Sequence, residues 1–171
     1  MNLKALIRDI PDFPKKGIVF KDIMPLLGDK DALRYLVDAM FVHYFGQRID
    51  KVVSAEARGF ILGPAVAYHL GAGFVAVRKP GKLPYRVKQI TYDLEYGTDS
   101  LTIHEDALKA GDQVLLIDDL LATGGTMAAT AQLVEKLGAK VIGAGFIIEL
   151  SFLKGRDKLK AYDVYSLIQY E

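Results

Sequence analysis

Short continuous runs of aliphatic residues recur along the chain, and this pattern is typical of strands that are buried on both faces of a parallel sheet. Such strands need helices on both sides of the sheet to cover them. The runs occupy residues 51–54, 74–77, 114–117, 141–148 and 164–168.

Helical spacing of apolar residues appears between these runs. Over residues 33–45 they repeat at i, i+3, i+4, i+7 and i+8, which predicts a helix with one buried face. Further helices are predicted over residues 61–70 and 127–137, and a glycine follows each of the three. The alternation contains no linker, repeat or low-complexity stretch. We therefore predict one α/β domain over residues 1–171, with a mostly parallel twisted sheet flanked by helices.

Residues 86–104 break the alternation. Two extended runs surround residues 97–99, and this pattern predicts a hairpin arm rather than another strand and helix of the central sheet.

Composition narrows the possible classes of protein. Hydrophobic residues make up 51% of the 171 residues, enough for a substantial core. The 22 basic and 21 acidic residues leave a net charge of +1, so no basic surplus points to nucleic acid. The absence of cysteine excludes disulfides, zinc–thiolate sites and thiol catalysis. No apolar stretch reaches the roughly 20 residues of a membrane span, and the first ten residues lack the apolar block of a signal peptide. We expect a cytoplasmic protein with neither nucleic acid nor membrane as a partner.

The strongest chemical signal follows the run at 114–117. Asp118 and Asp119 come at its end, where open α/β sheets bind their ligands. A turn of small residues comes next and leads into a helix, so its backbone N–H groups and hydroxyls suit an anion. Taken singly, each residue is compatible with an ordinary turn, but the ordered string favours a ligand site. The turn consists of Ala122, Thr123, Gly124, Gly125 and Thr126.

Cations gather after two other predicted strands. Arg58, followed by Gly59, lies in the turn after residues 51–54 and can hold an anion bidentately. A run of basic residues without an intervening acid follows residues 74–77. Such a run usually forms a solvated loop. Here it follows the carboxyl end of a strand of the same sheet, which favours a position beside the ligand site at residues 118–126. These basic residues are Arg78, Lys79, Lys82, Arg86 and Lys88.

The string at 114–126 resembles the phosphoribosyl-diphosphate signature of the type I phosphoribosyltransferases. The resemblance implies that the ligand is 5-phospho-α-D-ribosyl 1-diphosphate, that Asp118 and Asp119 hydrogen-bond the ribose hydroxyls, and that residues 122–126 bind the 5′-phosphate. It also implies a cis peptide bond between Glu56 and Ala57 in the pyrophosphate loop. The cations that we assign to pyrophosphate are Arg58, Arg78, Lys79 and Lys82.

Other segments are similar to the adenine-specific branch of this family, and the resemblance covers nearly the whole chain. They are PDFP at 11–14, GIVFKDI at 17–23, ARGF at 57–60, LEYG at 94–97 and LIQYE at 167–171. The resemblance implies transfer of the phosphoribosyl group to adenine, giving AMP and pyrophosphate in purine salvage. Mg²⁺ is expected as cofactor, held through substrate and water without protein ligands.

The resemblance also implies how the base is recognised and the site closed. It assigns adenine to Val19, Phe20 and Lys21 in a hood of about residues 1–30, although Lys21 stands where arginine is frequent. A flexible arm over about residues 82–104 is expected to close as a lid, with Glu95 handling the proton of adenine and Tyr96 covering the site. The catalytic set is then Glu95, Tyr96, Asp118 and Asp119.

The partners implied are adenine, phosphoribosyl diphosphate, AMP and pyrophosphate, together with a second copy of the chain in a homodimer. Two alternatives stay open. A transferase for 6-oxopurines would differ in which bases react. A non-enzymatic regulator that senses phosphoribosyl diphosphate is expected to carry an added nucleic-acid-binding element or to have lost the acid pair.

Overall fold

In the computed structural model, which describes residues 1–93 and 97–171, the centre of the protein is a five-stranded sheet in which every neighbouring pair of strands is parallel. Its strand order is β4–β3–β7–β8–β9. Each predicted run lies in one of these strands, so the predicted parallel α/β sheet is confirmed. The strands are β3 (Lys51–Ala55), β4 (Gly73–Val77), β7 (Gln113–Leu121), β8 (Lys140–Leu150) and β9 (Asp163–Tyr170).

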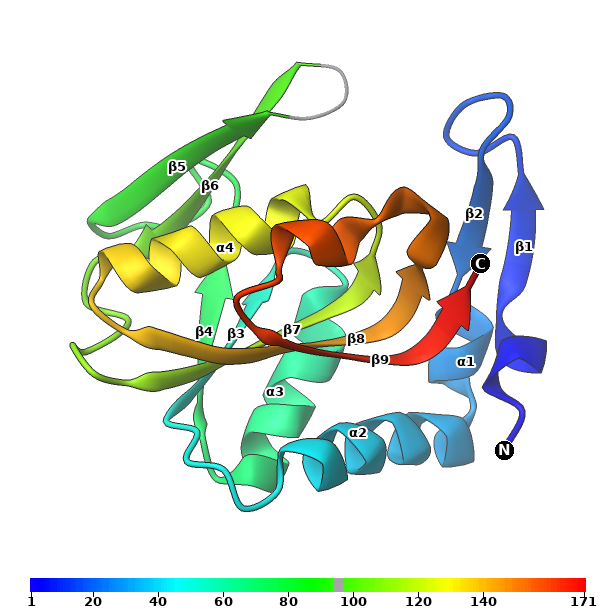
Figure 1. Ribbon diagram of the computed structural model, residues 1–171, viewed down its shortest axis with the longest axis horizontal. Helices are drawn as coiled ribbons and strands as arrows, with labels where there is room; N and C mark the ends of the chain where they lie inside the picture. The colour runs from blue at the N-terminus through cyan, green and yellow to red at the C-terminus, as the bar shows by residue number, and fades with distance from the viewer. Residues whose placement is uncertain (94–96) are drawn as a thin grey trace.

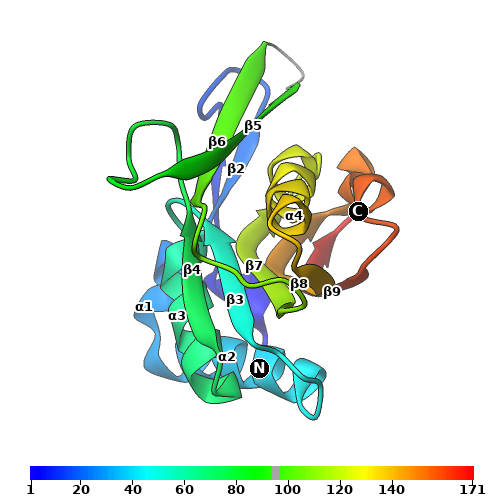
Figure 2. The ribbon, with the colours of Figure 1, turned by 90° about the vertical axis from the view of Figure 1, so that its left-hand side faces the viewer.

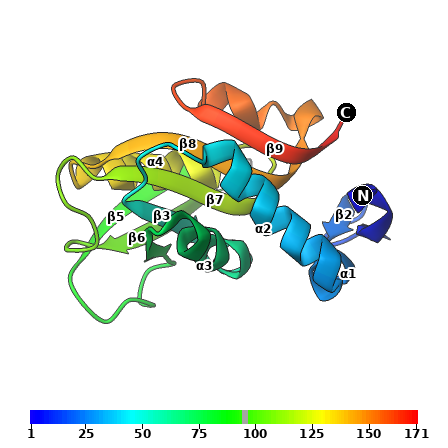
Figure 3. The ribbon, with the colours of Figure 1, turned by 90° about the horizontal axis from the view of Figure 1, so that it is seen from below.

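The three predicted helices are also present, and they cover both faces of the sheet. Helices α2 (Lys30–Tyr44) and α3 (Gly59–Leu70) lie on one face, and α4 (Gly125–Lys136) lies on the other (Figures 1 and 3). The helix stripe predicted through residue 45 ends one residue too late, because Phe45 is the C-cap of α2 and its side chain is 72% exposed. A short helix, α1 (Met24–Gly28), precedes α2.

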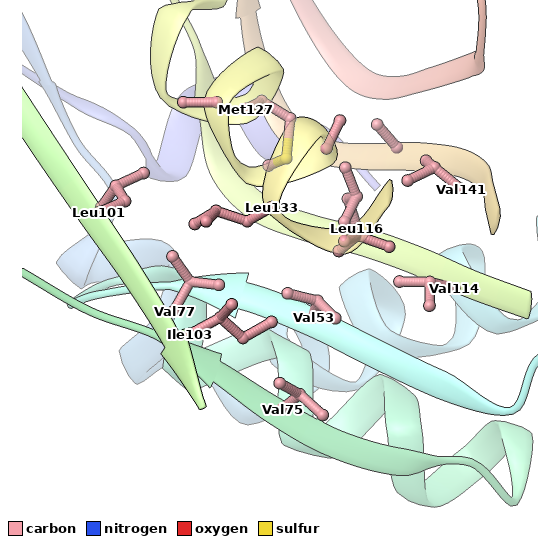
Figure 4. Close-up of a cluster of buried hydrophobic side chains, with 14 of the residues drawn as sticks. Val53, Val75, Val77, Leu101, Ile103, Val114, Leu116, Met127, Leu133 and Val141 are labelled. Atoms are coloured by element: carbon pink, nitrogen blue, oxygen red, sulfur yellow. The ribbon is translucent and has the colours of Figure 1, made fainter. Parts of the chain in front are cut away.

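The core on the α4 side extends into the arm. Met127 and Leu133 of α4 pack over the sheet together with Leu101 and Ile103 of the arm (Figure 4). Leu101 and Ile103 are 2% and 0% exposed. The base of the arm is therefore fixed by buried apolar contacts.

Two antiparallel hairpins flank the sheet. They stand on opposite sides of the molecule in Figure 1, and in Figure 2 one lies in front of the other. One joins β1 (Arg8–Pro11) to β2 (Val19–Asp22), and the other, the arm, joins β5 (Val87–Asp93) to β6 (Thr98–His104). Residues 98 and 99 were expected at the turn of the arm, but they pair with residues 93 and 92 inside the ladder. The predicted residues Glu95 and Tyr96 lie outside the described residues.

The connections of the sheet diverge between β3 and β7. From β3 the chain crosses through α3 to β4, whereas from β7 it crosses through α4 to β8 on the opposite face. Ligands of open α/β sheets bind at such a switch point, beyond the carboxyl ends of the strands. Two short 3-10 turns, Ser151–Leu153 and Gly155–Lys158, follow β8. No helix in the described part of the chain is long and apolar enough to cross a membrane.

Candidate active site

A cavity of about 480 Å³ opens at this switch point. Two loops line it: residues 56–58, which follow β3, and residues 118–127, which run from the end of β7 into α4. The acid pair and the glycine turn (residues 122–126) therefore share one wall, and Arg58 faces them from the other loop.

Asp118 and Asp119 lie within β7, which continues to residue 121 rather than ending at residue 117. The Arg58 Nε atom is 2.6 Å from Asp119 Oδ2. The Asp118 carboxylate accepts a hydrogen bond of 2.9 Å from the backbone N–H of residue 119. A methyl carbon at Gly59 would come within 2.8 Å of Asp118 Oδ1, so glycine at the first residue of α3 lets this carboxylate approach the helix closely.

Burial controls the protonation of the acid pair. It raises the pKa of Asp118 well above its ordinary value, and the negative charge of Asp119 adds to this effect. Burial also raises the pKa of Asp119, but the Arg58 guanidinium acts in the opposite direction. The two carboxyl groups interact closely, so they titrate as a pair.

The glycine turn is supported from behind by residues 151–158, which we call the buttress segment. Gly124 has a φ of +77°, and a methyl carbon at Gly124 or Gly155 would overlap the backbone of the other loop. Arg156 fixes the segment, since it donates two hydrogen bonds of 2.7 and 2.8 Å to the Glu149 carboxylate and one of 2.8 Å to the carbonyl of residue 164. Sequence reasoning missed this support, because no local pattern connects a surface-type turn with a distant loop.

The cations at residues 78–82 do not line the cavity, and carboxylates hold two of them. Arg78 donates to Glu56 Oε2 from Nε and Nη2 at 3.3 and 3.0 Å. The backbone N–H of Lys79 and the Arg78 side chain hold the pKa of Glu56 below its ordinary value. The Lys79 ammonium pairs with Asp99 of the arm. Lys82 contributes its carbonyl, which accepts a 3.4 Å hydrogen bond from Arg78.

The three residues assigned to the base lie on β2 of the N-terminal hairpin. The Arg58 guanidinium carbon is 5.2 Å from the centroid of the Phe20 ring, so this ring lies beside the cavity wall. Val19 is 49% exposed. Lys21 pairs with Asp9 at 2.7 Å and lies 4.2 Å from the centroid of the Tyr170 ring, so it is engaged within the hairpin and with the end of β9.

Among the described residues, no group of three or more histidine, aspartate or glutamate side chains is arranged to hold a metal ion. Asp118 and Asp119 form only a pair, and Arg58 already contacts one of them.

Comparison with known proteins decides the family. Residues 30–169 match the family described as phosphoribosyl transferase domain. An adenine phosphoribosyltransferase of Syntrophotalea carbinolica is 58% identical over 169 residues, which cover 99% of both chains. The chain belongs to the adenine phosphoribosyltransferases. It is therefore a pentosyltransferase of purine salvage, and the resemblance stated from the sequence is confirmed.

Solved structures agree with this membership of the adenine phosphoribosyltransferases. That of the Thermoanaerobacter pseudethanolicus enzyme is 54% identical, covers 98% of both chains and superposes with a TM-score of 0.96. That of the Saccharomyces cerevisiae enzyme, in complex with adenine and an imino-altritol bisphosphate, is 43% identical, covers 96% of both chains and superposes with a TM-score of 0.92.

Proposed function

We propose that the chain transfers the 5-phosphoribosyl group of 5-phospho-α-D-ribosyl 1-diphosphate to adenine, giving AMP and pyrophosphate, at the cavity between residues 56–58 and 118–127. The observation that carries the proposal is the buried acid pair, which adjoins a turn of backbone N–H groups at the start of α4. Carboxylates accept hydrogen bonds from hydroxyls, and N–H groups donate to phosphate oxygens. A ribose 5-phosphate matches that sequence of partners.

The catalytic roles follow from charge. Displacement at the anomeric carbon passes through a state with positive charge on the ribose, which Asp118 and Asp119 favour. The leaving pyrophosphate gains negative charge, and Arg58 is the cation in the cavity wall that can neutralise it. Three cations outside the cavity wall are also assigned to the pyrophosphate: Arg78, Lys79 and Lys82. Arg78 and Lys79 would have to leave their carboxylate partners to bind it.

Mg²⁺ is the proposed cofactor, and it would reach the site with the diphosphate. When bound, it shares the negative charge of the leaving group. Its proposed ligands are diphosphate oxygens and water, and Asp118 and Asp119 stay assigned to the ribose hydroxyls.

Adenine is assigned to the N-terminal hairpin. Phe20 can stack on the purine, and the backbone N–H and C=O of residues 19–21 can pair with N1 and the 6-amino group. The contact between Arg58 and the Phe20 ring supports this assignment, because it brings the hairpin next to the cavity. We further propose that residues of about 1–30 act as a hood, that the arm closes the site, and that Glu95 handles the proton of adenine while Tyr96 covers the base.

A homodimer in the cytoplasm is the proposed state of the enzyme. Apolar side chains on α2 and α3 support an interface there: Val42, Ile61 and Tyr68 are 69%, 44% and 86% exposed. An exposed apolar face of this kind is typical of subunit contacts. Light scattering coupled to size exclusion should give twice the mass of 18.9 kDa; the mass of a single chain would contradict the dimer.

The decisive experiment measures nucleotide formation from phosphoribosyl diphosphate and Mg²⁺ with adenine, hypoxanthine, guanine and xanthine in parallel. AMP formation with the other three bases inert is expected. Asp119→Asn should abolish turnover while leaving the melting curve cooperative, and Glu95→Gln should lower kcat more than donor affinity. Turnover of a 6-oxopurine would discard the base assignment, and donor binding without any turnover would indicate a regulator.

A further inference from the structure

Four polar side chains form a continuous series of contacts near the outer end of the arm ladder, where Tyr92 pairs with Asp99. The Tyr92 hydroxyl on β5 lies 3.2 Å from Thr126 Oγ1 in the glycine turn and 3.2 Å from Asp99 Oδ2 on β6. Asp99 Oδ2 also accepts from the Lys79 ammonium, and its other oxygen accepts 2.8 Å from the backbone N–H of Ser100. We call the series Lys79–Asp99–Tyr92–Thr126 the relay.

The relay joins two groups that the proposed function assigns to opposite ends of the same substrate. Thr126 belongs to the turn assigned to the 5′-phosphate, and Lys79 to the cations assigned to pyrophosphate. Tyr92 also packs on the turn, since a methyl carbon at Gly125 would lie 3.6 Å from two of its ring carbons. Its place is therefore fixed by packing as well as by hydrogen bonds.

The Tyr92 hydroxyl has a single proton for its two neighbours, Asp99 and Thr126. Partial burial acts to raise the pKa of Asp99, but Lys79 and the Ser100 N–H outweigh it and lower the pKa overall, so this carboxylate is ionised and only accepts. Burial raises the pKa of Tyr92, so its hydroxyl keeps its one proton. Tyr92 can donate this proton to Asp99 or to Thr126, but not to both. When Asp99 receives it, the proton of Thr126 must fill the Tyr92–Thr126 contact, and the phosphate loses a donor.

We propose that Tyr92 is a positioning residue that couples the 5′-phosphate end of the site to the pyrophosphate end. In the structure, Asp99 Oδ2 accepts from both Lys79 and the Tyr92 hydroxyl. Because Lys79 neutralises this carboxylate, the Tyr92 hydroxyl can turn from it to Thr126 when a phosphate binds, and the Thr126 proton then points to the phosphate. When pyrophosphate takes Lys79 from Asp99, the carboxylate needs the Tyr92 proton, and Thr126 turns back to Tyr92. The inference rests on the proposed function, because it takes these two groups as ligand-binding residues.

The coupling is antagonistic: each ligand weakens the hydrogen bonding available to the other through the relay. The intact donor is held at both ends by one covalent framework, whereas the products are separate molecules. After transfer, antagonism between the two ends favours departure of pyrophosphate while AMP is still bound.

Tyr92→Phe keeps the ring and removes the hydroxyl, so it separates the relay from packing. Calorimetry should give the Kd of ribose 5-phosphate alone, of magnesium pyrophosphate alone, and of ribose 5-phosphate at saturating magnesium pyrophosphate. We expect the Kd of pyrophosphate to rise about fivefold in the variant, because Asp99 then loses Lys79 without gaining a proton from Tyr92. The Kd of ribose 5-phosphate should stay the same or fall, and its increase on adding pyrophosphate should be about threefold smaller than in the wild type.

Tyr162→Phe is the matched control. Its hydroxyl donates a 2.7 Å hydrogen bond to Glu135 outside the cavity, so the variant loses the same kind of bond, and all three constants should stay at their wild-type values. Equal rises of both Kd values in Tyr92→Phe would indicate general damage and overturn the coupling. An unchanged effect of pyrophosphate on ribose 5-phosphate would overturn it as well.

The same titrations distinguish failure of the coupling from failure of the proposed function. If Thr126→Val weakens ribose 5-phosphate while Tyr92→Phe leaves the coupling intact, only the relay is refuted. If the wild-type protein binds neither ligand, the assignment of the site falls, and the relay falls with it.

Discussion

Gly155→Ala tests whether the glycine turn depends on the buttress segment. Gly155 does not have a positive φ, so alanine can adopt its backbone conformation without strain. The added methyl carbon would nevertheless lie 2.3 Å from the carbonyl oxygen of Ala122 and 2.9 Å from Leu121 Cδ1. The substitution therefore acts through contact with the turn and not through backbone conformation.

The size of the effect follows from this overlap. Ordinary van der Waals contacts of a methyl carbon begin near 3.4 Å, so the buttress segment and the turn must separate by about 1.1 Å. Misplacement of positioning groups by about 1 Å can lower a reaction rate roughly 100-fold. We take this scale as the upper limit for binding, because the buttress segment can absorb part of the shift. We expect the Kd of ribose 5-phosphate to rise roughly 10- to 100-fold, and the free energy of unfolding to fall by about 1–3 kcal/mol, as in overpacked cores.

The assay compares the two ends of the site in one protein. Calorimetry with ribose 5-phosphate should show the loss, whereas the Kd of magnesium pyrophosphate should change less than about twofold, because Arg58 lies on the other loop. Gly28→Ala is the control: a methyl carbon there meets no atom within 4 Å, and this glycine lies in helix α1 without a positive φ. Wild-type affinity for ribose 5-phosphate in folded Gly155→Ala would refute the dependence of the turn on the buttress segment.

Three further substitutions test the electrostatics of the site. Asp118→Asn should raise the free energy of unfolding at pH 7.5 by about 1–2 kcal/mol while lowering turnover, because burial raises the pKa of Asp118 and disfavours its charge. The folded protein holds this proton more tightly than the unfolded chain does. The stability of the wild type relative to Asp118→Asn should therefore fall as pH rises from the ordinary carboxyl pKa to the raised pKa of Asp118. A stability difference that stays constant across that pH range would contradict this reasoning. Glu56→Gln should behave in the opposite way, because the pKa of Glu56 is lowered. The wild type should be more stable than the variant at pH 7, and this difference should disappear as pH falls below the ordinary glutamate pKa. Thermal melts at several pH values measure the difference. Arg156→Lys should raise the Kd of ribose 5-phosphate several-fold without affecting pyrophosphate, because lysine cannot reproduce the two parallel hydrogen bonds to Glu149, and calorimetry would show no change if the buttress segment does not need that pair.

The sheet could be predicted because its strands are buried on both faces and leave unbroken aliphatic runs. Strand β7 was predicted too short for a related reason. Asp118 and Asp119 interrupt the apolar run, but the ladder with β8 continues through Leu120 and Leu121. Backbone pairing does not depend on side-chain polarity. Pairing with the long strand β8 therefore continues past Asp118 and Asp119, where the apolar pattern predicted that β7 ends.

The acid pair and the glycine turn could be predicted because they adjoin in sequence and are read as one string. Their supports could not be, since each is a long-range contact of a common residue type. Gly155 behind the turn and Tyr92 beside Thr126 look like ordinary loop and strand residues until the chain is folded. The basic run after β4 is the intermediate case: its position was predictable, but its pairing with carboxylates of the β3 loop and the arm was not.

Three of the proposed anion-binding cations share one feature, since each contacts a carboxylate in the structure. The pairs are Arg58 with Asp119, Arg78 with Glu56, and Lys79 with Asp99. Binding of pyrophosphate then exchanges one partner of a cation for another, and a carboxylate is left behind. A buried carboxylate without partners costs several kcal/mol, so the exchange is feasible only where another donor stands ready.

Two of the three carboxylates, Glu56 and Asp99, have such a donor within the protein. Glu56 keeps the backbone N–H of Lys79, which is already bonded to it, and Asp99 keeps Ser100 and Tyr92. Asp119 differs, because the donors that can replace Arg58 in its proposed role are hydroxyls of the ribose itself. Release of Arg58 toward pyrophosphate is therefore favourable only when a ribose occupies the site. On this reasoning pyrophosphate without a sugar engages Arg58 weakly, and Asp119→Asn, which frees Arg58, should tighten binding of pyrophosphate alone even as it abolishes turnover.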